Sequence, residues 1–296
     1  MKVPFQLTRQ FALCCALVPA VVGTSQAARP ATRPNVVVMM VDDMGFAGPS
    51  IAPYGNPHYK TPGMDRLARE GMRFTDFHAS GAICSATRAG LVTGRYQQRA
   101  GIEAVIHPRD THPEHRKGLH ESEVTFAELF KAAGYATGLV GKYHIRQNPR
   151  GFDHWCIHPG QGEYFDPVYI RNGRRVQKKG YATDITTDLA LEYLESVDKN
   201  RPFCLVYQFK APHRPFTPAP RHAELYSDIE IPKPASYDDD YATRRIAAQA
   251  EDMRFEISLA DDYDDLPSDL DPEEHKDWIY QRYTVDRYRA ITSVDE

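Results

Sequence analysis

Cys84 and Arg88 are the pair of residues in this sequence that most strongly suggests chemistry. They lie four residues apart in GAICSATRAGLVTGR, where the pattern predicts that a helix begins at the cysteine. Free amide groups at a helix N-terminus, with a cation one turn further on, favour an anion, whether thiolate, sulfate or phosphate. The pair therefore predicts a reactive thiol or an anion site, and a buried structural cysteine is the alternative.

Asp42 and Asp43 are adjacent carboxylates that follow the apolar run NVVVMMV, with Gly45 just beyond them. Two like charges held together are costly unless protons or a cation compensate them. Carboxylate oxygens suit Ca²⁺ or Mg²⁺. The pair indicates a metal site, for which we expect Ca²⁺ rather than Mg²⁺, and a turn or helix cap at the edge of a sheet is the alternative.

Lys142, His144 and His213 supply further polar groups. Lys142 and His144 alternate in GKYHI, so an extended chain would direct both side chains to one face, and His213 lies between prolines in APHRP. Taken singly, each is explained as a surface lysine or a loop histidine. Taken with Cys84 and Arg88, they predict a site that stabilises charge on a transferring oxyanion group, with the histidines as candidate bases.

Three apolar runs are typical of buried strands in a parallel sheet: NVVVMMV (35–41), YATGLVG (135–141) and PFCLVYQF (202–209). Segments with helical spacing lie between them, so the order is strand, helix, strand, helix, strand. This alternation predicts an α/β domain with a largely parallel central sheet flanked by helices. Ligands of such sheets bind beyond the carboxyl ends of the strands. All the candidate polar residues except Cys84 and Arg88 come just after one of these strands.

Local signals mark the ends of two of the predicted helices. Thr61 and Gly71 bound the first helix, which starts with a proline. Thr125 and Glu128 have capping-box spacing at the start of the second, and Gly134 is placed for its C-terminal cap.

Composition and the N-terminus indicate an exported globular protein. The chain has 296 residues, of which 42% are hydrophobic and 26% charged, and its net charge is −4 without a basic block, so we expect no nucleic-acid partner. Basic residues, the apolar run FALCCALVPAVVG and the small residues SQA predict a signal peptide over 1–27 and a periplasmic or secreted protein. A retained N-terminal anchor is the alternative, and we expect no stable membrane insertion.

The mature chain would keep three cysteines, Cys84, Cys156 and Cys204. An odd number leaves one thiol over after any disulfide. The sequence leaves open whether Cys156 and Cys204 pair.

Over nearly all of its mature length, the sequence resembles the type I sulfatases, which are formylglycine-dependent members of the alkaline phosphatase superfamily. The similar motifs, in order, are RPNVVVMMVDDMG, TPGMDRLAREGMRFTDFHA, CSATRAGLVTGR, SEVTFAELFKAAGYATGLVGKYHI, GFDHW, APHRPF and YRAITSVDE. The family converts the cysteine of a CxPxR or CxAxR motif to formylglycine. Its hydrated aldehyde attacks the sulfur of a sulfate ester.

The resemblance implies a role for each candidate residue. Cys84 would be the precursor of formylglycine, made by a formylglycine-generating maturation enzyme, and Arg88 the motif arginine. Ca²⁺ would be held by Asp42, Asp43 and the group made from Cys84, and the contacts to sulfate or the diol would come from Lys142, His144 and His213. The chain departs from the usual pattern at Ala86, Thr87, Tyr143 and Arg146.

By resemblance, 34–296 is the N-terminal catalytic domain of a sulfatase acting on a sulfated small molecule or carbohydrate. Family members continue past the equivalent of YRAITSVDE into a strand with further metal ligands and a small C-terminal domain. We therefore expect an incomplete sheet and metal site and impaired activity in the 296-residue chain. The alternatives are a phosphomonoester or phosphonate hydrolase of the same superfamily and a non-catalytic binder of sulfated glycans.

Overall fold

The computed structural model describes residues 33–45, 52–55, 60–107, 113, 117–146, 148–233, 237–243, 271, 274 and 276–282. The predicted signal peptide (1–27) lies outside these residues. Residues 276–282 are helical. Before them, Asp271 and Glu274 exchange two bonds of 2.9 Å between side chain and backbone, which is the pairing of a capping box.

A six-stranded sheet forms the centre of the fold, in the order β1-β6-β2-β3-β4-β5. Its parallel part comprises β1 (Val36–Met40), β6 (Phe203–Gln208), β2 (Ala136–Gly141) and β3 (His154–Ile157). The predicted α/β architecture with a largely parallel sheet is confirmed.

The strand register aligns the carboxyl ends that carry the candidate site. Met40 of β1 and Gly141 of β2 both pair with Gln208 of β6. Chain continuing from these positions therefore emerges at one edge of the sheet, as expected for parallel strands.

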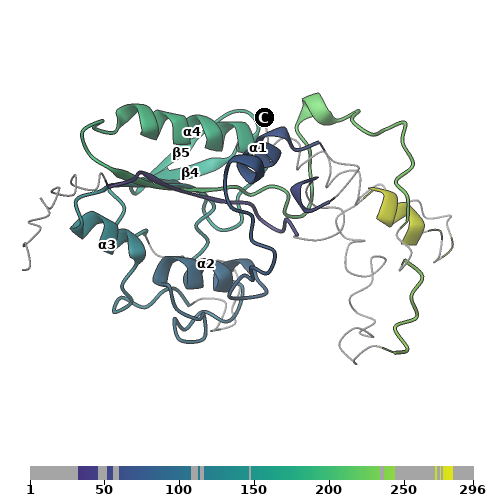
Figure 1. The fold of residues 1–296 in the computed structure, drawn as a ribbon, viewed down its shortest axis with the longest axis horizontal. Helices are drawn as coiled ribbons and strands as arrows, with labels where there is room; N and C mark the ends of the chain where they lie inside the picture. Colours follow the sequence, from purple (N-terminus) through teal and green to yellow (C-terminus); the bar gives the residue numbers. More distant parts are fainter. Residues whose placement is uncertain are drawn as a thin grey trace, which may run out of the picture. The chain divides into compact units, whose positions relative to one another are not determined.

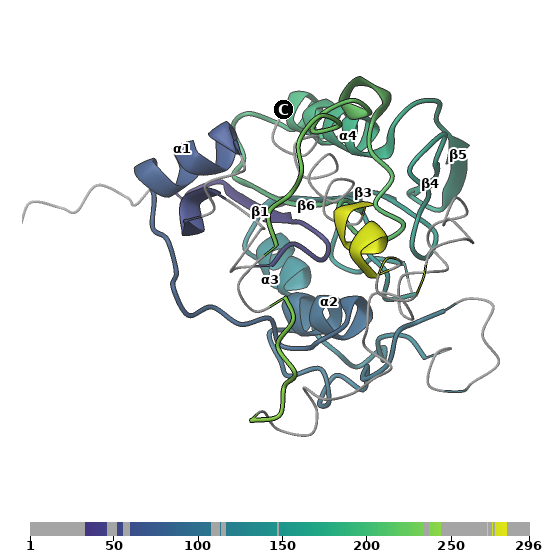
Figure 2. The same cartoon turned by 90° about the vertical axis from the view of Figure 1, so that its right-hand side faces the viewer.

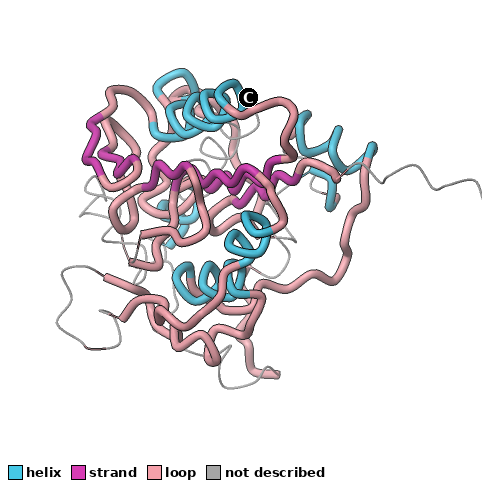
Figure 3. The backbone as a smooth tube through the Cα atoms, turned by 90° about the vertical axis from the view of Figure 1, so that its left-hand side faces the viewer, coloured by secondary structure: helices cyan, strands magenta, loops and turns pink. Residues whose placement is uncertain are grey.

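Helices cover both faces of the sheet. Figure 1 shows α4 (Ala182–Ser196) on one face and α2 (Cys84–Thr93) and α3 (Phe126–Ala132) on the other, and Figure 3 shows the strands as one layer between helices. Each face has its own apolar core, one packed against α2 and α3 and one against α4. In Figure 2, β1 lies beside β6, with α1 (Pro62–Glu70) near the outer end of β1.

The predicted capping signals of α3 are confirmed. The Thr125 hydroxyl accepts a bond from the Glu128 N–H at 3.3 Å, and the Glu128 carboxylate accepts one from the Thr125 N–H at 2.8 Å. Gly134 has φ 83° just past the helix, and the next amide, of Tyr135, donates to the Phe130 carbonyl at 3.0 Å. Helix α1 is likewise bounded by Thr61 and Gly71, although Thr61 makes no side-chain capping bond.

The sequence analysis missed an antiparallel extension of the sheet. Strands β4 (Val168–Arg171) and β5 (Arg174–Gln177) form a hairpin that joins β3. The turn is Asn172-Gly173, with φ of 44° and 87°. Asn-Gly is a strong signal for a two-residue hairpin turn, so this element was recognisable from the sequence.

Candidate active site

Cys84 is the first residue of α2, as the sequence predicts, and lies at the edge of a cavity of about 280 Å³. The preceding residue, Ile83, is extended and caps no amide group with its side chain. The walls of the cavity include Asp42, Asp43 and Arg88. A helix N-terminus, a sulfur atom and a buried cation therefore share one hollow, which is an environment that favours anions.

Arg88, Asp42 and Lys142 form a buried cluster of charges, with exposed fractions of 1%, 5% and 0%. One Asp42 oxygen accepts a bond from Arg88 Nη2 at 3.1 Å and the other accepts one from Lys142 Nζ. Arg88 Nη1 donates to the Lys142 carbonyl and the Gln208 amide oxygen. Burial alone would raise the pKa of Asp42, but Arg88 and then Lys142 outweigh it and lower that pKa below its usual value.

His144 is also buried, but its two ring nitrogens are used within the protein. Nε2 donates to the Ile106 carbonyl at 2.8 Å, and Nδ1 lies 3.5 Å from the Ser85 hydroxyl, which in turn accepts the Ile106 N–H. Burial and then Lys142 and Arg88 lower the pKa of His144 to about 3, so its ring is neutral near pH 7.

The expectation of an extended chain through Lys142 and His144 is wrong. Strand β2 ends at Gly141, and His144 has φ 52°. Lys142 reaches the Asp42 carboxylate, whereas His144 contacts Ser85 of α2 and is not among the residues lining the Cys84 cavity.

His213 and Asp43 lie together at the mouth of the site. His213 Nε2 is 3.7 Å from Asp43 Oδ2, and Nδ1 is 2.8 Å from the Arg214 carbonyl. Because a carbonyl can only accept, Nδ1 carries the proton of the neutral ring and Nε2 is left to accept one. Burial and then Lys142 lower the pKa of His213. The Tyr164 hydroxyl donates to the His213 carbonyl and so fixes this segment.

Lys210 is a buried cation that the sequence analysis missed. It is 6% exposed, lies two residues past the end of β6, and its ammonium lies 4.8 Å from the centre of the Tyr164 ring. Burial and then Lys142 lower its pKa to about 8. Lys210 comes just before APHRP, the segment after a predicted strand that contains His213, so its position could have identified it from the sequence.

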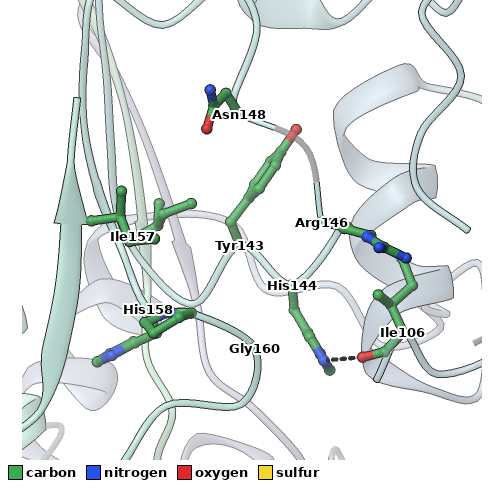
Figure 4. Close-up of a pocket in the computed structure, with 10 residues that line it drawn as sticks. Ile106, Tyr143, His144, Arg146, Asn148, Ile157, His158 and Gly160 are labelled. Atoms are coloured by element: carbon green, nitrogen blue, oxygen red, sulfur yellow. Dashed lines mark hydrogen bonds between the residues drawn. The ribbon is translucent and has the colours of Figure 1, made fainter. Parts of the chain in front are cut away.

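A second cavity, of about 210 Å³, is lined in part by the loop that follows β2. Figure 4 shows Tyr143, His144 and Arg146 from this loop around it, with His144 bonded to the Ile106 carbonyl and Ile157 from the end of β3 opposite. Its walls are mostly apolar, in contrast to the charged Cys84 cavity.

Asp42 and Asp43 are the acids that line the Cys84 cavity and are the candidate metal ligands there. No group of three or more His, Cys, Asp or Glu side chains suited to a metal occurs among the residues that the structure describes. Both oxygens of Asp42 are, moreover, bonded to cations. The described part of the chain does not by itself form a Ca²⁺ site, and the Ca²⁺ site stays a prediction.

Cys84, Cys156 and Cys204 are all free thiols. Cys156 and Cys204 lie on β3 and β6, which are separated by β2, so the disulfide that the sequence left open does not form. No helix among the described residues is long and apolar enough to cross a bilayer.

Comparison with known proteins identifies the family. Residues 34–296 match the family model described as Sulfatase, and the chain belongs to this family. It is 40% identical over 235 residues to the N-acetylglucosamine-6-O-sulfatase of Bacteroides thetaiotaomicron, covering 78% of this chain and 40% of the relative. It is 31% identical over 226 residues to human N-acetylgalactosamine-6-sulfatase, covering 65% of this chain and 41% of the relative.

A solved structure of a protein in complex with its substrate D-glucosamine-2-N,6-O-disulfate has the same fold. The TM-score is 0.81 at 34% identity, and the match covers 89% of this chain and 60% of that one. The chain thus spans 40% of the bacterial relative and 60% of this structural neighbour.

Proposed function

We propose that this chain binds sulfate esters of carbohydrates in the Cys84 cavity and cleaves them as a sulfatase. The observation that carries the proposal is the buried cluster beside Cys84, in which Arg88 and Lys142 share the single carboxylate of Asp42. Cations fixed in a site of low polarity stabilise an anionic group and the charge that develops on it during transfer. Two cations and one carboxylate leave this buried cluster with one positive charge in excess. A sulfate monoester carries the single negative charge that would balance it.

The relatives favour a 6-O-sulfated amino sugar as the substrate. One relative is named an N-acetylglucosamine-6-O-sulfatase, and the structural neighbour is described with a 6-O-sulfated glucosamine. We infer that a 6-O-sulfated N-acetylglucosamine is the first substrate to test.

The reaction that we propose starts from a modified Cys84. Once a formylglycine-generating enzyme has oxidised this residue, its hydrated aldehyde supplies the nucleophilic oxygen. Arg88 and Lys142 orient the sulfate group and stabilise charge on its oxygens, together with the amide groups at the start of α2. His213 Nε2 is the nitrogen free to accept a proton, because Nδ1 donates to the Arg214 carbonyl.

His144 has a positioning role in this proposal. Its Nε2 holds the Ile106 carbonyl, and its Nδ1 lies beside Ser85, the residue after Cys84. The ring thereby ties the end of β2 to the first turn of α2.

Ca²⁺ and export also belong to the proposal. Asp42 and Asp43 are the residues of this chain that would contribute to a Ca²⁺ site, and no step of the reaction above is assigned to the ion. The signal-peptide pattern over 1–27 supports a periplasmic or secreted protein, which N-terminal sequencing of the mature chain would test.

The test compares sulfate and phosphate esters. The chain is co-expressed with a formylglycine-generating enzyme and given N-acetylglucosamine 6-sulfate or 6-phosphate, with Cys84→Ala and chain made without that enzyme as controls. We expect sulfate release only from the matured wild-type chain. Faster cleavage of the phosphate ester would favour a phosphomonoester hydrolase, and saturable binding without product would favour a glycan binder.

A further inference from the structure

Lys210 lies at the same edge of the sheet as the sulfate site but has no assigned role. β6, which ends two residues before it, lies between β1 and β2, the strands that lead to Asp42 and Lys142. Its side chain packs on the Tyr164 ring, and the charges that act on it are Lys142, Asp42, Glu163 and Asp43. Lys210 is therefore within electrostatic reach of the charged cluster.

The ammonium group of Lys210 lacks a carboxylate partner among the described residues. Its ammonium group lies over the ring of Tyr164, and the acids that act on it electrostatically do so from beyond ion-pair distance. A buried ammonium without a paired anion is costly. The ring contact offsets only part of this cost.

The charges at this edge of the sheet do not balance without an anion. The imbalance is one of buried charges: Arg88, Lys142 and Lys210 are buried cations and Asp42 is the buried carboxylate among them, whereas Glu163 is exposed and the Asp43 side chain is 55% exposed. Such an excess raises the local concentration of an anion and favours its binding.

We propose that Lys210 is a further positive group of the sulfate site, which attracts and orients the bound sulfate ester from the end of β6. The inference rests on the proposed function, because it takes the anion to be the sulfate group of the substrate. Arg88 and Lys142 both bond to Asp42, so Lys210 contributes a buried positive charge that forms no ion pair with a carboxylate among the described residues.

A purely structural role for Lys210 makes different predictions. The lysine stem packs on Tyr164, whose hydroxyl anchors the His213 carbonyl, so Lys210 could act only by supporting that tyrosine. Lys210→Met keeps an unbranched side chain over the ring and removes the charge, whereas Lys210→Arg keeps the charge. The two variants therefore separate charge from packing.

Binding of inorganic sulfate, measured by isothermal titration calorimetry at several NaCl concentrations, tests the proposal. We expect Lys210→Met to bind sulfate about 10-fold more weakly, as for a lost bond to a charged group, with a weaker dependence on salt. Lys210→Arg should stay close to wild type. Lys233→Met is the matched control, because Lys233 also lies over a tyrosine ring, 4.6 Å from that of Tyr237, but in another part of the chain.

Each outcome has a defined meaning. Equal sulfate affinity of Lys210→Met and wild type, or an equal loss in Lys210→Met and Lys210→Arg, would overturn the role of the charge. A wild-type chain that binds no sulfate would overturn both this inference and the proposed binding site. Sulfate binding without ester cleavage would overturn the proposed catalysis. The comparison of the Lys210 variants would then still decide whether the charge of Lys210 contributes to sulfate binding. Thermal melts identify any variant that does not fold, in which case Lys210→Gln replaces Lys210→Met.

Discussion

At the scale of single residues, the candidate site depends on buried charged side chains that compensate one another. Asp42 holds Arg88 with one oxygen and Lys142 with the other. The desolvation of three charged groups is costly, and only their mutual attraction and hydrogen bonds compensate it. Asp42 is therefore as important to the stability of the fold as to the chemistry of the cavity.

Replacing Asp42 by asparagine should destabilise the chain. Arg88 and Lys142 would remain buried without a compensating charge, which costs about 3 kcal/mol or more. Urea unfolding measures the loss. The matched control is Asp184→Asn, which breaks a two-bond pair with Arg221 whose side chains are 44% and 41% exposed. That exposed pair should cost less than about 1 kcal/mol, and equal losses for the two variants would contradict the argument.

His158 should make the fold sensitive to acid. Its ring stacks against Tyr169 at 4.3 Å and is fully buried, and burial, followed by Lys210 and Lys142, lowers its pKa to about 3. An unfolded histidine has a pKa of about 6.5, so between these values the unfolded chain binds the additional proton and stability falls as the pH falls. This histidine alone should remove about 2 kcal/mol of stability between pH 7 and pH 5.

The variant His158→Gln tests this expectation through the pH dependence of stability rather than its absolute value. Between pH 7 and pH 5 the variant should lose less stability than the wild type, as measured by urea unfolding at each pH. His120→Gln, the same substitution at an exposed position, is measured in parallel as the control. A variant as sensitive to acid as the wild type would show that His158 is not the source.

At the scale of elements, the helix ends show what a capping residue contributes. Thr125 and Thr61 both precede a helix and both are buried, but only Thr125 takes part in a capping box. The buried hydroxyl of Thr61 has no hydrogen-bond partner among the described residues. The two threonines also differ in backbone conformation: φ and ψ are −93° and 152° at Thr125, which is extended, but −121° and 69° at Thr61.

Alanine at these two positions should have different effects. Thr125→Ala should cost about 1 kcal/mol, because the Glu128 amide and carboxylate both lose a partner. Thr61→Ala should be neutral or stabilising, because it removes a buried hydroxyl that makes no bond. Thermal or urea unfolding of the two variants provides the measurement, and a larger loss at Thr61 would refute this account of the caps.

The elements that could be predicted are those marked by a local sequence pattern, such as an apolar run or a capping residue. They include three of the four strands in the parallel part of the sheet. The apolar runs that became β1, β2 and β6 and the caps of α3 all reflect short-range chemistry. Strands β3 to β5 were missed because each has only four residues, too few for a periodic pattern to be distinct. Their Asn172-Gly173 turn was the one local signal available.

At the scale of the whole molecule, the position of the candidate site followed from topology, whereas its detailed contacts did not. Parallel strands bring Asp42, Lys142 and His213 to one edge because their carboxyl ends are aligned. The contact of His144 with the Ile106 carbonyl depends on the path of the chain between α2 and α3, for which the sequence has no periodic signal. The pairing of Asp42 with two cations likewise depends on three segments distant in sequence.

The two buried thiols offer a test of whether the sheet opens as one unit. Cys156 and Cys204 are 1% and 0% exposed, on β3 and β6, and burial raises the pKa of both thiols, to about 11 for Cys204. Both apolar cores contain residues from β2, β3 and β6, so opening one strand disrupts packing on both faces of the sheet. The parallel part of the sheet should therefore open cooperatively.

Alkylation at increasing urea concentration, read thiol by thiol by peptide mass spectrometry, measures this opening. Unmodified Cys84, which is only partly buried at the edge of its cavity, should react first under native conditions. Cys156 and Cys204 should react together, at the urea concentration where the whole fold is lost, because neither sulfur is accessible until both cores open. Early reaction of Cys156 alone would instead show that β3 and the β4–β5 hairpin separate from the parallel strands as an independent unit, joined to β2 by only four residue pairs.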